Sequence, residues 1–307
     1  METGISVHSL SKTYRGGRVR ALDKVDLGVR QGEVLGVIGP NGAGKTSLMG
    51  CMLGLLRPDQ GSVLFGEKPP GDLFIKAQLG YVPERLSFER WMTGRAFVAF
   101  HHALAKLPAG ERPARVARAL QRVGLPAESW GRPIQRYSRG MLQRVGLAQA
   151  LVGSPRYLFL DEPTSGMDPE GVLMFQHLVE ELRQEGATVV LNSHQLPHVA
   201  RLCDRVAFLK AGRVEAVEEL RRGELWRGVK VRWLGEAPPA RLAGLDMLAR
   251  KAGCELVEKR AGEALFRVPG DRAAAALIGA LVRRGFKVVE TMAGEDRLEK
   301  LFEGGKP

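Results

Sequence analysis

The segment from Gly39 to Thr46, GPNGAGKT, constrains this 307-residue chain more than any other. It fits the pattern G-x-x-x-x-G-K-[ST], in which a glycine-rich turn joins a strand to a helix and surrounds phosphate with backbone N–H groups. Here the apolar run 33–38 precedes the turn, and residues 47–53 read as the start of a helix. An accidental glycine-rich turn would lack that context, so the segment predicts a nucleotide site in an α/β fold.

The predicted loop assigns a physical task to each of its residues. Its glycines would allow backbone conformations and close approaches that a Cβ obstructs. We expect Lys45 to reach the β- and γ-phosphates of the nucleotide and the Thr46 hydroxyl to ligate Mg²⁺. The predicted nucleotide-binding residues of the loop are Gly39, Asn41, Gly42, Ala43, Gly44, Lys45, Thr46 and Ser47.

An acidic pair, Asp161 and Glu162, follows a second apolar strand at 156–160. Asp161 is expected to hold Mg²⁺, through water, and Glu162 to polarise the water that attacks the γ-phosphate. Two acids that only end a strand are the structural alternative, which the preceding phosphate-binding loop disfavours. A further core strand, 188–191, leads to His194, where a lone histidine is either structural or a γ-phosphate contact.

Other segments are typical of a sheet with an inserted group of helices. Residues 4–30 read as two strands joined by a loop, 11–20, that carries Tyr14. This tyrosine either stacks on an adenine face or is a surface turn residue. Ser138 is expected to cap one helix, with or without a phosphate at the same N-terminus, and Asp168 to cap another. The remaining predicted elements are strands at 62–66 and 76–84, helices between about 92 and 153, and a hairpin at 205–209 and 213–217.

Composition sets limits on the class of protein. With 44% hydrophobic and 26% charged residues, the chain is typical of a globular protein. It shows no apolar run of about 18 residues and no signal peptide, so we expect a cytosolic location. Its three cysteines show no metal or disulfide spacing. The net charge of +12 suggests nucleic acid or an anionic membrane, but the basic residues are scattered and favour a solvated or membrane-adjacent surface.

The ordered motifs resemble the nucleotide-binding subunit of an ABC transporter. They are the P-loop, the signature-like YSRGM at 137–141, the Walker B run YLFLDEP at 157–163, the D-loop-like SGMD at 165–168, and His194 in NSHQ. A P-loop alone is shared with helicases, GTPases and kinases. The signature-like segment and the histidine distinguish this chain from them.

The resemblance implies two copies, or a pair with a related ATPase subunit, packed head to tail. Each ATP–Mg²⁺ would lie between the P-loop of one copy and Ser138 and Gly140 of the other. Tyr14 would stack on adenine, Glu162 would be the catalytic base, and His194 would contact the γ-phosphate. Asp168 would connect the two sites. ATP binding would close the dimer, and hydrolysis would reopen it and move separate transmembrane permease subunits.

Two departures from the family pattern favour its ABC-2 branch, whose members commonly export their cargo. Glu84 replaces the glutamine of the Q-loop, where a carboxylate can still ligate Mg²⁺ or water. Tyr137 and Met141 replace the outer residues of the LSGGQ signature. Within that branch the segments around 137–151 and 193–199 resemble the ATPase that serves the copper-linked maturation of nitrous oxide reductase.

The C-terminal part predicts a separate module. We expect an ABC domain at 1–222, with a helical subdomain at about 85–153, and an accessory α+β domain at 223–307. The strands and helices of the latter follow the order β-α-β-β-α-β, typical of a ferredoxin-like fold, and a short helix, RLEKLF, follows at 297–302.

The sequence supports two classes of function. The first is an energy-coupling ATPase on the cytoplasmic face of the inner membrane. The second is a soluble ABC-type ATPase that acts on nucleic acid or ribosomes. Translation-type members usually carry two cassettes, and repair-type members carry a coiled coil or a zinc module between the P-loop and the signature. The single cassette and the absence of heptads or cysteine pairs between Lys45 and Ser138 favour the transport subunit, with no nucleic-acid partner.

Overall fold

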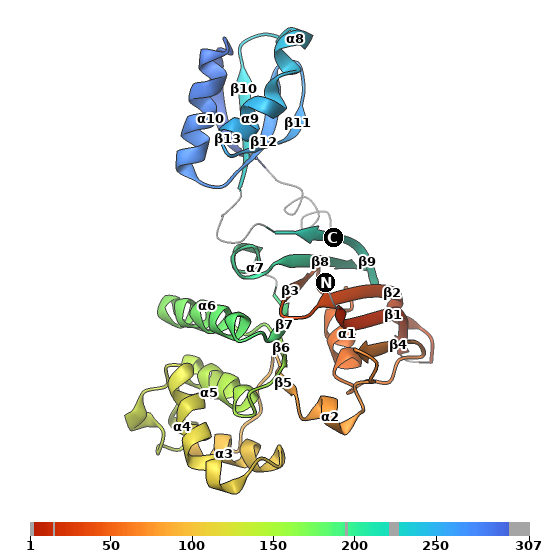
Figure 1. Cartoon of the computed structure of the whole chain (residues 1–307), viewed down its shortest axis with the longest axis vertical. Coiled ribbons are helices and arrows are strands. Elements are labelled where there is room, and N and C mark those ends of the chain that lie inside the picture. Colours follow the sequence, from red (N-terminus) through yellow and green to blue (C-terminus); the bar gives the residue numbers. More distant parts are fainter. Residues whose placement is uncertain (1–2, 15, 194–195, 221–226, 295–307) are drawn as a thin grey trace. The chain divides into compact units, whose positions relative to one another are not determined.

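Two units, each with its own hydrophobic core, make up the chain; the first contains two sheets and the second contains one (Figure 1). The structure is a computed structural model that describes residues 3–14, 16–193, 196–220 and 227–294. The first unit contains residues 1–195 and 202–220, and the second contains 196–201 and 221–307. Within the described ranges, no helix is long and apolar enough to cross a membrane.

The central sheet of the first unit is built from short apolar strands. They are β3 (Val34–Ile38), β5 (Leu79–Val82), β6 (Tyr157–Asp161), β7 (Thr188–Asn192), β8 (Arg205–Lys210) and β9 (Arg213–Glu219), and the helices beside them include α1 (Lys45–Met52), α5 (Arg139–Leu151) and α6 (Pro169–Gln184). The strand order is β5-β6-β7-β3-β8-β9, with only β9 antiparallel. Every residue of β3, β6 and β7 is buried, as expected for parallel strands covered on both faces. In Figure 1, α1 lies on one side of this sheet and α5 and α6 lie on the other.

A second, antiparallel sheet of order β2-β1-β4 lies at the N-terminus. Its strands are β1 (Thr3–Tyr14), β2 (Val19–Arg30) and β4 (Gln60–Phe65). The predicted loop at 11–20 is wrong, because Tyr14 is the last residue of β1 and pairs with Val19. The backbone N and the Oγ1 of Thr13 both donate to Asp59 Oδ2 at 2.6 Å, which extends the strand. These bonds and Lys12 lower the pKa of Asp59 to about 2.

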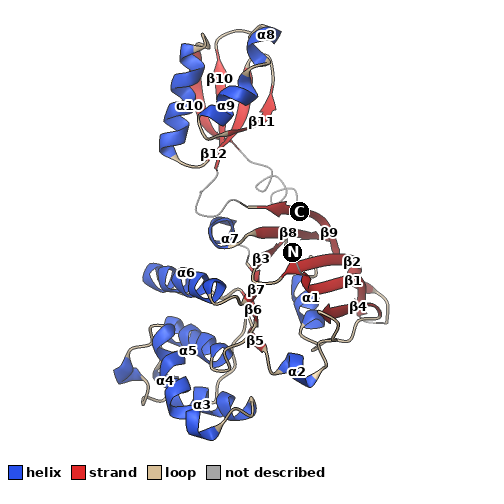
Figure 2. Ribbon diagram, viewed as in Figure 1, coloured by secondary structure: helices blue, strands red, loops and turns tan. Residues whose placement is uncertain are grey.

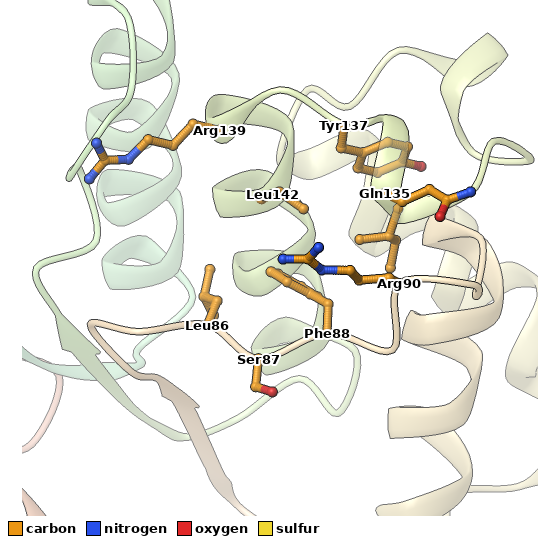
Figure 3. A pocket seen from close by; sticks show the side chains of 9 residues that line it. Leu86, Ser87, Phe88, Arg90, Gln135, Tyr137, Arg139 and Leu142 are labelled. Atoms are coloured by element: carbon orange, nitrogen blue, oxygen red, sulfur yellow. The ribbon is translucent and has the colours of Figure 1, made fainter.

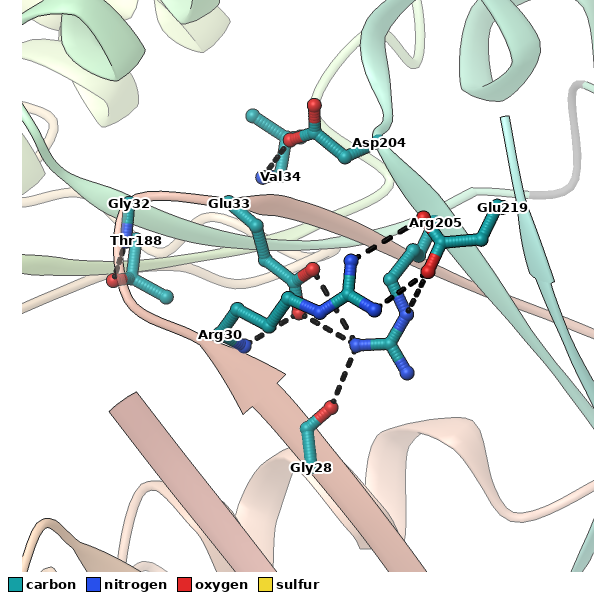
Figure 4. Close-up of polar contacts among 9 residues, drawn as sticks. All are labelled: Gly28, Arg30, Gly32, Glu33, Val34, Thr188, Asp204, Arg205 and Glu219. Atoms are coloured by element: carbon teal, nitrogen blue, oxygen red, sulfur yellow. Dashed lines mark hydrogen bonds and ion pairs between the residues drawn. The ribbon is translucent and has the colours of Figure 1, made fainter. Parts of the chain in front are cut away.

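An ion-pair network ties the start of the P-loop strand to the far edge of its sheet (Figure 4). Arg205 Nη1 lies 3.1 Å from Glu33 Oε1, and Arg30 Nη2 lies 2.6 Å from Glu219 Oε1. Burial raises the pKa of Glu33, while the Arg30 backbone N–H and the Arg205 guanidinium oppose the rise. Because Glu33 is only 6% exposed, its pairing with Arg205 holds a buried charge in place directly before β3.

The inserted helices confirm the helical region predicted between 92 and 153. They are α3 (Gly94–Leu104), α4 (Arg112–Arg122) and α5, joined by short 3₁₀ turns at 109–111, 127–129 and 134–136. The predicted strand at 76–84 is shorter, because its first residue belongs to a helix that the sequence analysis did not find, α2 (Leu73–Lys76). Asp72 caps α2 by accepting from the N–H groups of Phe74 and Ile75.

The second unit has the strand order expected for a ferredoxin-like module (Figure 2). Its elements are β10 (Arg227–Trp233), α8 (Pro239–Leu242), α9 (Leu245–Lys251), β11 (Glu255–Lys259), β12 (Glu263–Val268), α10 (Asp271–Arg283) and β13 (Val288–Gly294), besides α7 (Leu196–Leu202) earlier in the chain. The sheet runs β11-β12-β10-β13 with every pair antiparallel. The helix predicted at 240–252 is divided at Gly244 into α8 and α9. The helix predicted at 297–302 lies outside the described residues.

All three cysteines are buried, and none of them is bridged by a disulfide. Cys51 lies in α1, within the core that both sheets of the first unit share. Burial raises the pKa of the Cys51 thiol, and it raises the pKa of Cys254 to about 11. Both side chains are therefore protonated packing residues at neutral pH.

Candidate functional site

The loop between β3 and α1 folds its lysine back onto its own backbone. Lys45 is buried, and its Nζ donates to the carbonyl oxygens of Gly39 at 2.7 Å and Pro40 at 3.1 Å. Burial lowers the pKa of Lys45, while the nearby carboxylates of Glu162, Asp161 and Glu84 raise it in part. The ammonium group is thus held inside the loop, at the place where the phosphates of a nucleotide were predicted.

Two glycines of this loop make approaches that no other residue allows. A Cβ on Gly39 would overlap the carbonyl oxygen of Leu209, and a Cβ on Gly44 would overlap that of Ala21. Gly44 also has φ +105° and begins α1. Gly42, at φ +79°, needs its glycine for the backbone conformation alone, since the space beside it is open.

The mouth of the loop is open to solvent. Asn41, Gly42 and Thr46 are exposed, whereas Ala43 is buried beneath them. Tyr14, at the end of β1, is half-buried, and its hydroxyl lies 3.2 Å from Ser47 Oγ on α1. The structure therefore brings Tyr14, the predicted adenine-stacking residue, beside the predicted phosphate loop. Gly44 of that loop lies 30 residues later in the sequence.

A buried polar pair ends the two neighbouring strands β6 and β7. Asp161 and Asn192 are opposite each other in register, and Asn192 Nδ2 donates to Asp161 Oδ1. Burial raises the pKa of Asp161, with smaller contributions from Glu84 and Glu162, while the Asn192 hydrogen bond and Lys45 oppose the rise. Sequence reasoning missed Asn192, although its position at the end of the strand beside β6 was a signal.

The chain offers a partial set of ligands for Mg²⁺. Asn192 Oδ1 is buried without a hydrogen-bond partner among the described residues, and it lies on the same side chain that contacts Asp161. The Thr46 hydroxyl is exposed at the loop. No group of three or more His, Cys, Asp or Glu side chains in the described ranges could hold a metal. These residues fit an ion that keeps several waters and is shared with phosphate oxygens, as Mg²⁺ commonly is.

Glu162 sits in a strained backbone position directly after Asp161. Its φ is +48°, which is uncommon for a residue with a Cβ. The Glu162 N–H donates to Asn192 O at 2.9 Å, and the Ser165 N–H donates to Glu162 O at 3.1 Å. Strain held in place in this way clusters at functional sites. Glu84, two residues beyond β5, is exposed, and its negative charge acts to raise the pKa values of Lys45 and Asp161.

Ser138, Gly140 and Asp168 lie at the starts of two helices on the other side of the sheet from α1 (Figure 1). The Ser138 hydroxyl accepts from the Met141 N–H at 3.2 Å, as predicted for an N-cap, and Asp168 Oδ1 accepts from the Gly171 N–H at 2.8 Å. Ser138 is exposed, and the space beside Gly140 is open. His194, predicted to contact the γ-phosphate, lies outside the described residues.

A cavity of about 530 Å³ separates the segment after β5 from the segment that enters α5 (Figure 3). Its lining is Leu86, Ser87, Phe88, Arg90, Ile134, Gln135, Tyr137, Arg139 and Leu142. Tyr137, which departs from the family signature, is buried, and its hydroxyl donates to Ser129 O at 2.6 Å. The tyrosine therefore anchors the segment before Ser138 to the 3₁₀ turn at 127–129.

Comparison with known proteins identifies the family. The family model described as "ABC transporter" matches residues 22–165. An uncharacterized ABC transporter ATP-binding protein of Nostoc sp. is 41% identical over 214 residues, which cover 68% of this chain and 64% of that protein. The uncharacterized ABC transporter ATP-binding protein YxlF of Bacillus subtilis is 32% identical over 309 residues, 97% and 98% of the two chains. The methionine import ATP-binding protein MetN of Caulobacter vibrioides is 41% identical, with 70% and 68% covered.

A solved structure has the same fold. A dimeric post-hydrolysis state of an ATP-binding cassette bound to ADP and Pi superimposes with a TM-score of 0.66 and 26% identity, covering 71% of this chain and 99% of that one. The chain spans 64% and 60% of the length of two cyanobacterial relatives, but nearly all of the Bacillus protein. On these matches, the chain belongs to the family of ABC transporter ATP-binding proteins.

Proposed function

We propose that this chain is the ATP-hydrolysing subunit of a membrane ABC transporter. Two copies would bind two ATP–Mg²⁺ between them and drive a conformational change in separate permease subunits. The observation that carries the proposal is the grouping of Lys45, Asp161 and Asn192 around the P-loop. They provide one buried cation and a buried carboxamide–carboxylate pair where phosphate and metal would meet.

The residues of the loop divide the catalytic work. Backbone N–H groups from Gly42 to Thr46 and the N-terminus of α1 would cradle the β- and γ-phosphates, and Lys45 would exchange its contacts with Gly39 O and Pro40 O for phosphate oxygens. When bound, Mg²⁺ neutralises charge on the phosphate oxygens. Thr46 and Asp161 would hold it. Glu84, whose charge is felt at Lys45 and Asp161, would ligate the ion or one of its waters.

Glu162 is the proposed base. It directly follows Asp161 and has a strained φ, and its backbone N–H is bonded to Asn192 O on the next strand. A carboxylate at that position would orient the attacking water and accept its proton. His194 would contact the γ-phosphate from the segment after β7, and Tyr14 would stack on adenine next to Ser47. Most of the catalysis would then be positioning and electrostatics.

The second half of each site would come from another subunit. Ser138 and Gly140 begin α5, on the opposite side of the sheet from α1, and the surface beside them is open. A helix N-terminus with free space is suited to a phosphate supplied by a neighbour. The structurally similar cassette is dimeric, which supports a pair of subunits. In the pair that we propose, each P-loop would face the other subunit's Ser138. Asp168, at the start of α6, would lie near the junction of the two sites.

The permease would contact both segments that flank the 530 Å³ cavity. One of them follows Glu84, and the other leads through Tyr137 to Ser138. A permease segment seated in the cavity would therefore couple to the metal side of one site and the signature side of the other. We propose on this basis that the chain is a peripheral subunit on the cytoplasmic face of the inner membrane.

The direction of transport rests on two opposing observations. Glu84, Tyr137 and Met141 favour the exporting ABC-2 branch, and within it the ATPase of nitrous oxide reductase maturation. In contrast, the Caulobacter relative is named a methionine import protein and a Paracoccus denitrificans relative a zinc import protein. We propose export as the first hypothesis. Identification of the polytopic membrane protein that co-purifies with the chain tests it, and recovery with ribosomes or nucleic acid would reject transport altogether.

The variant Glu162→Gln tests the enzymatic proposal. It should bind ATP, elute from gel filtration as a dimer when ATP and Mg²⁺ are present, and lose nearly all turnover, because it lacks the base but keeps the shape of the site. Glu128→Gln, an exposed glutamate in the 3₁₀ turn at 127–129, is the matched control and should hydrolyse ATP at the wild-type rate. Wild-type turnover in Glu162→Gln would remove that residue from the mechanism.

A further inference from the structure

Arg139 occupies a place where a helix disfavours a cation. It is the first residue of α5, between Ser138 and Gly140, and the first turn contains no acidic residue. The N-terminus of a helix carries partial positive charge, so a guanidinium there is unfavourable on local grounds. A residue that violates a local rule commonly has a compensating contact with a functional purpose.

The compensating contact is made with the turn between β6 and α6. Arg139 Nη2 donates to Ser165 Oγ at 3.1 Å. The side chain also lies directly against Gly166, where an added Cβ would overlap Arg139 Nε and Cδ. In Figure 3 the Arg139 side chain points away from the other labelled residues of the cavity. Gly166 also has φ +76°, a conformation that favours glycine. Because it has no side chain, the arginine can pack against its backbone.

That turn joins two residues of the proposed mechanism. The Ser165 N–H donates to Glu162 O at 3.1 Å, so the turn begins at the proposed base. It ends at Asp168, which caps α6. Arg139 therefore links the helix start that would receive a neighbour's phosphate to the segment that holds the base of its own subunit.

We propose that Arg139 is a positioning residue that transmits occupancy between the two ATP sites. Phosphate at Ser138 fixes the start of α5, and Arg139 then fixes Ser165 and Gly166, which orders the backbone that carries Glu162. The inference rests on the proposed dimer. It adds a link within one subunit between the signature segment and the base, and the arginine is not itself a phosphate ligand in this arrangement.

ATP hydrolysis by the full-length chain with Mg²⁺ tests the link. Arg139→Ala and Ser165→Ala should each lower kcat about threefold to tenfold, the range expected for one charged hydrogen bond that is partly exposed, with KM changed less than twofold. The double variant should be no slower than either single variant. Arg139→Lys should recover part of kcat, and the wild-type Hill coefficient for ATP should be above 1 and fall to 1 in both alanine variants.

The controls separate this link from simpler roles. Arg136→Ala, at an exposed arginine just before the signature segment, should leave kcat and the Hill coefficient unchanged. Thermal unfolding must show that the variants fold. If Arg139→Ala is slow while Ser165→Ala is normal, the arginine acts through its charge on phosphate and the proposal is wrong. Additive effects, or a wild-type Hill coefficient of 1, would also overturn it. ATP-dependent dimerisation of Glu162→Gln reports on the proposed function separately, so the link can fail while the dimer stands.

Discussion

The hydrogen bond from Asn192 to Asp161 gives the sharpest quantitative prediction. Asp161 is 1% exposed, and burial raises its pKa despite the amide that donates to it. In the variant Asn192→Ala the buried carboxylate loses that donor. Hydrogen bonds to charged groups contribute about 1.5–3 kcal/mol to stability, so the free energy of unfolding should fall by roughly that amount at pH 8.

The predicted loss depends on pH with a defined sign. Because the pKa of Asp161 in the folded chain is raised above its unfolded value, the cost of the buried charge is full above the folded pKa. It is relieved as the pH falls through that value and the carboxyl takes up a proton. Removal of the Asn192 donor raises the pKa further, so the variant is relieved first. Because the folded pKa lies above the ordinary value of 3.8, the difference in unfolding free energy between wild type and variant should be smaller at pH 4 than at pH 8.

Equilibrium urea unfolding of the full chain at the two pH values measures this difference. The cavity left by alanine adds a loss that does not depend on pH, so it cancels between the two conditions. The same substitution in an Asp161→Asn background is the control, and its effect should be equal at both pH values. An Asn192→Ala loss that is absent, or that has the same size at pH 8 and pH 4, would refute the electrostatic account of this pair.

Three further predictions concern single side chains. Lys45→Ala should weaken ATP binding at least about tenfold in calorimetric titration, since it removes the buried ammonium; unchanged affinity would contradict the P-loop assignment. Glu84→Gln should keep ATP hydrolysis, because the glutamine can still bind metal or water, and complete loss would show a specific task for the carboxylate. His102 in α3 has no exposed surface and no hydrogen-bond partner for either ring nitrogen among the described residues, and burial lowers its pKa. Below pH 6.5 the unfolded chain binds a proton that the folded chain refuses, so His102→Leu should gain stability relative to wild type as the pH falls from 7.5 to 5.5 in thermal unfolding; an equal difference at both values would exclude this effect.

Local patterns predicted the elements that depend on local chemistry. The loop 39–46, the capping residues Ser138 and Asp168, and the buried strands were readable because glycine conformation, helix caps and apolar runs are encoded within a few residues. The extension of β1 to Tyr14 was not readable, since it depends on Asp59, which is remote in sequence. The same holds for the short helix α2, whose four residues show no periodic face.

The candidate site shows the same division. Lys45, Asp161 and Glu162 stand in motifs whose spacing is fixed by one turn or one strand. Asn192 became visible only when β7 was placed beside β6. The sequence analysis did not single out Arg139, because its partners at 165 and 166 are brought to it by the fold. Contacts between distant segments are the part that periodicity and propensity cannot supply.

The burial of all three thiols makes the native chain a ready background for site-directed labelling. With Cys51, Cys203 and Cys254 enclosed, and with the pKa of Cys254 at about 11, a maleimide dye should react at neutral pH almost solely with a cysteine introduced at the surface. A single such residue beside the P-loop, labelled separately with donor and acceptor dyes in two preparations, would report the distance between neighbours in a mixed sample without any prior removal of native sulfur.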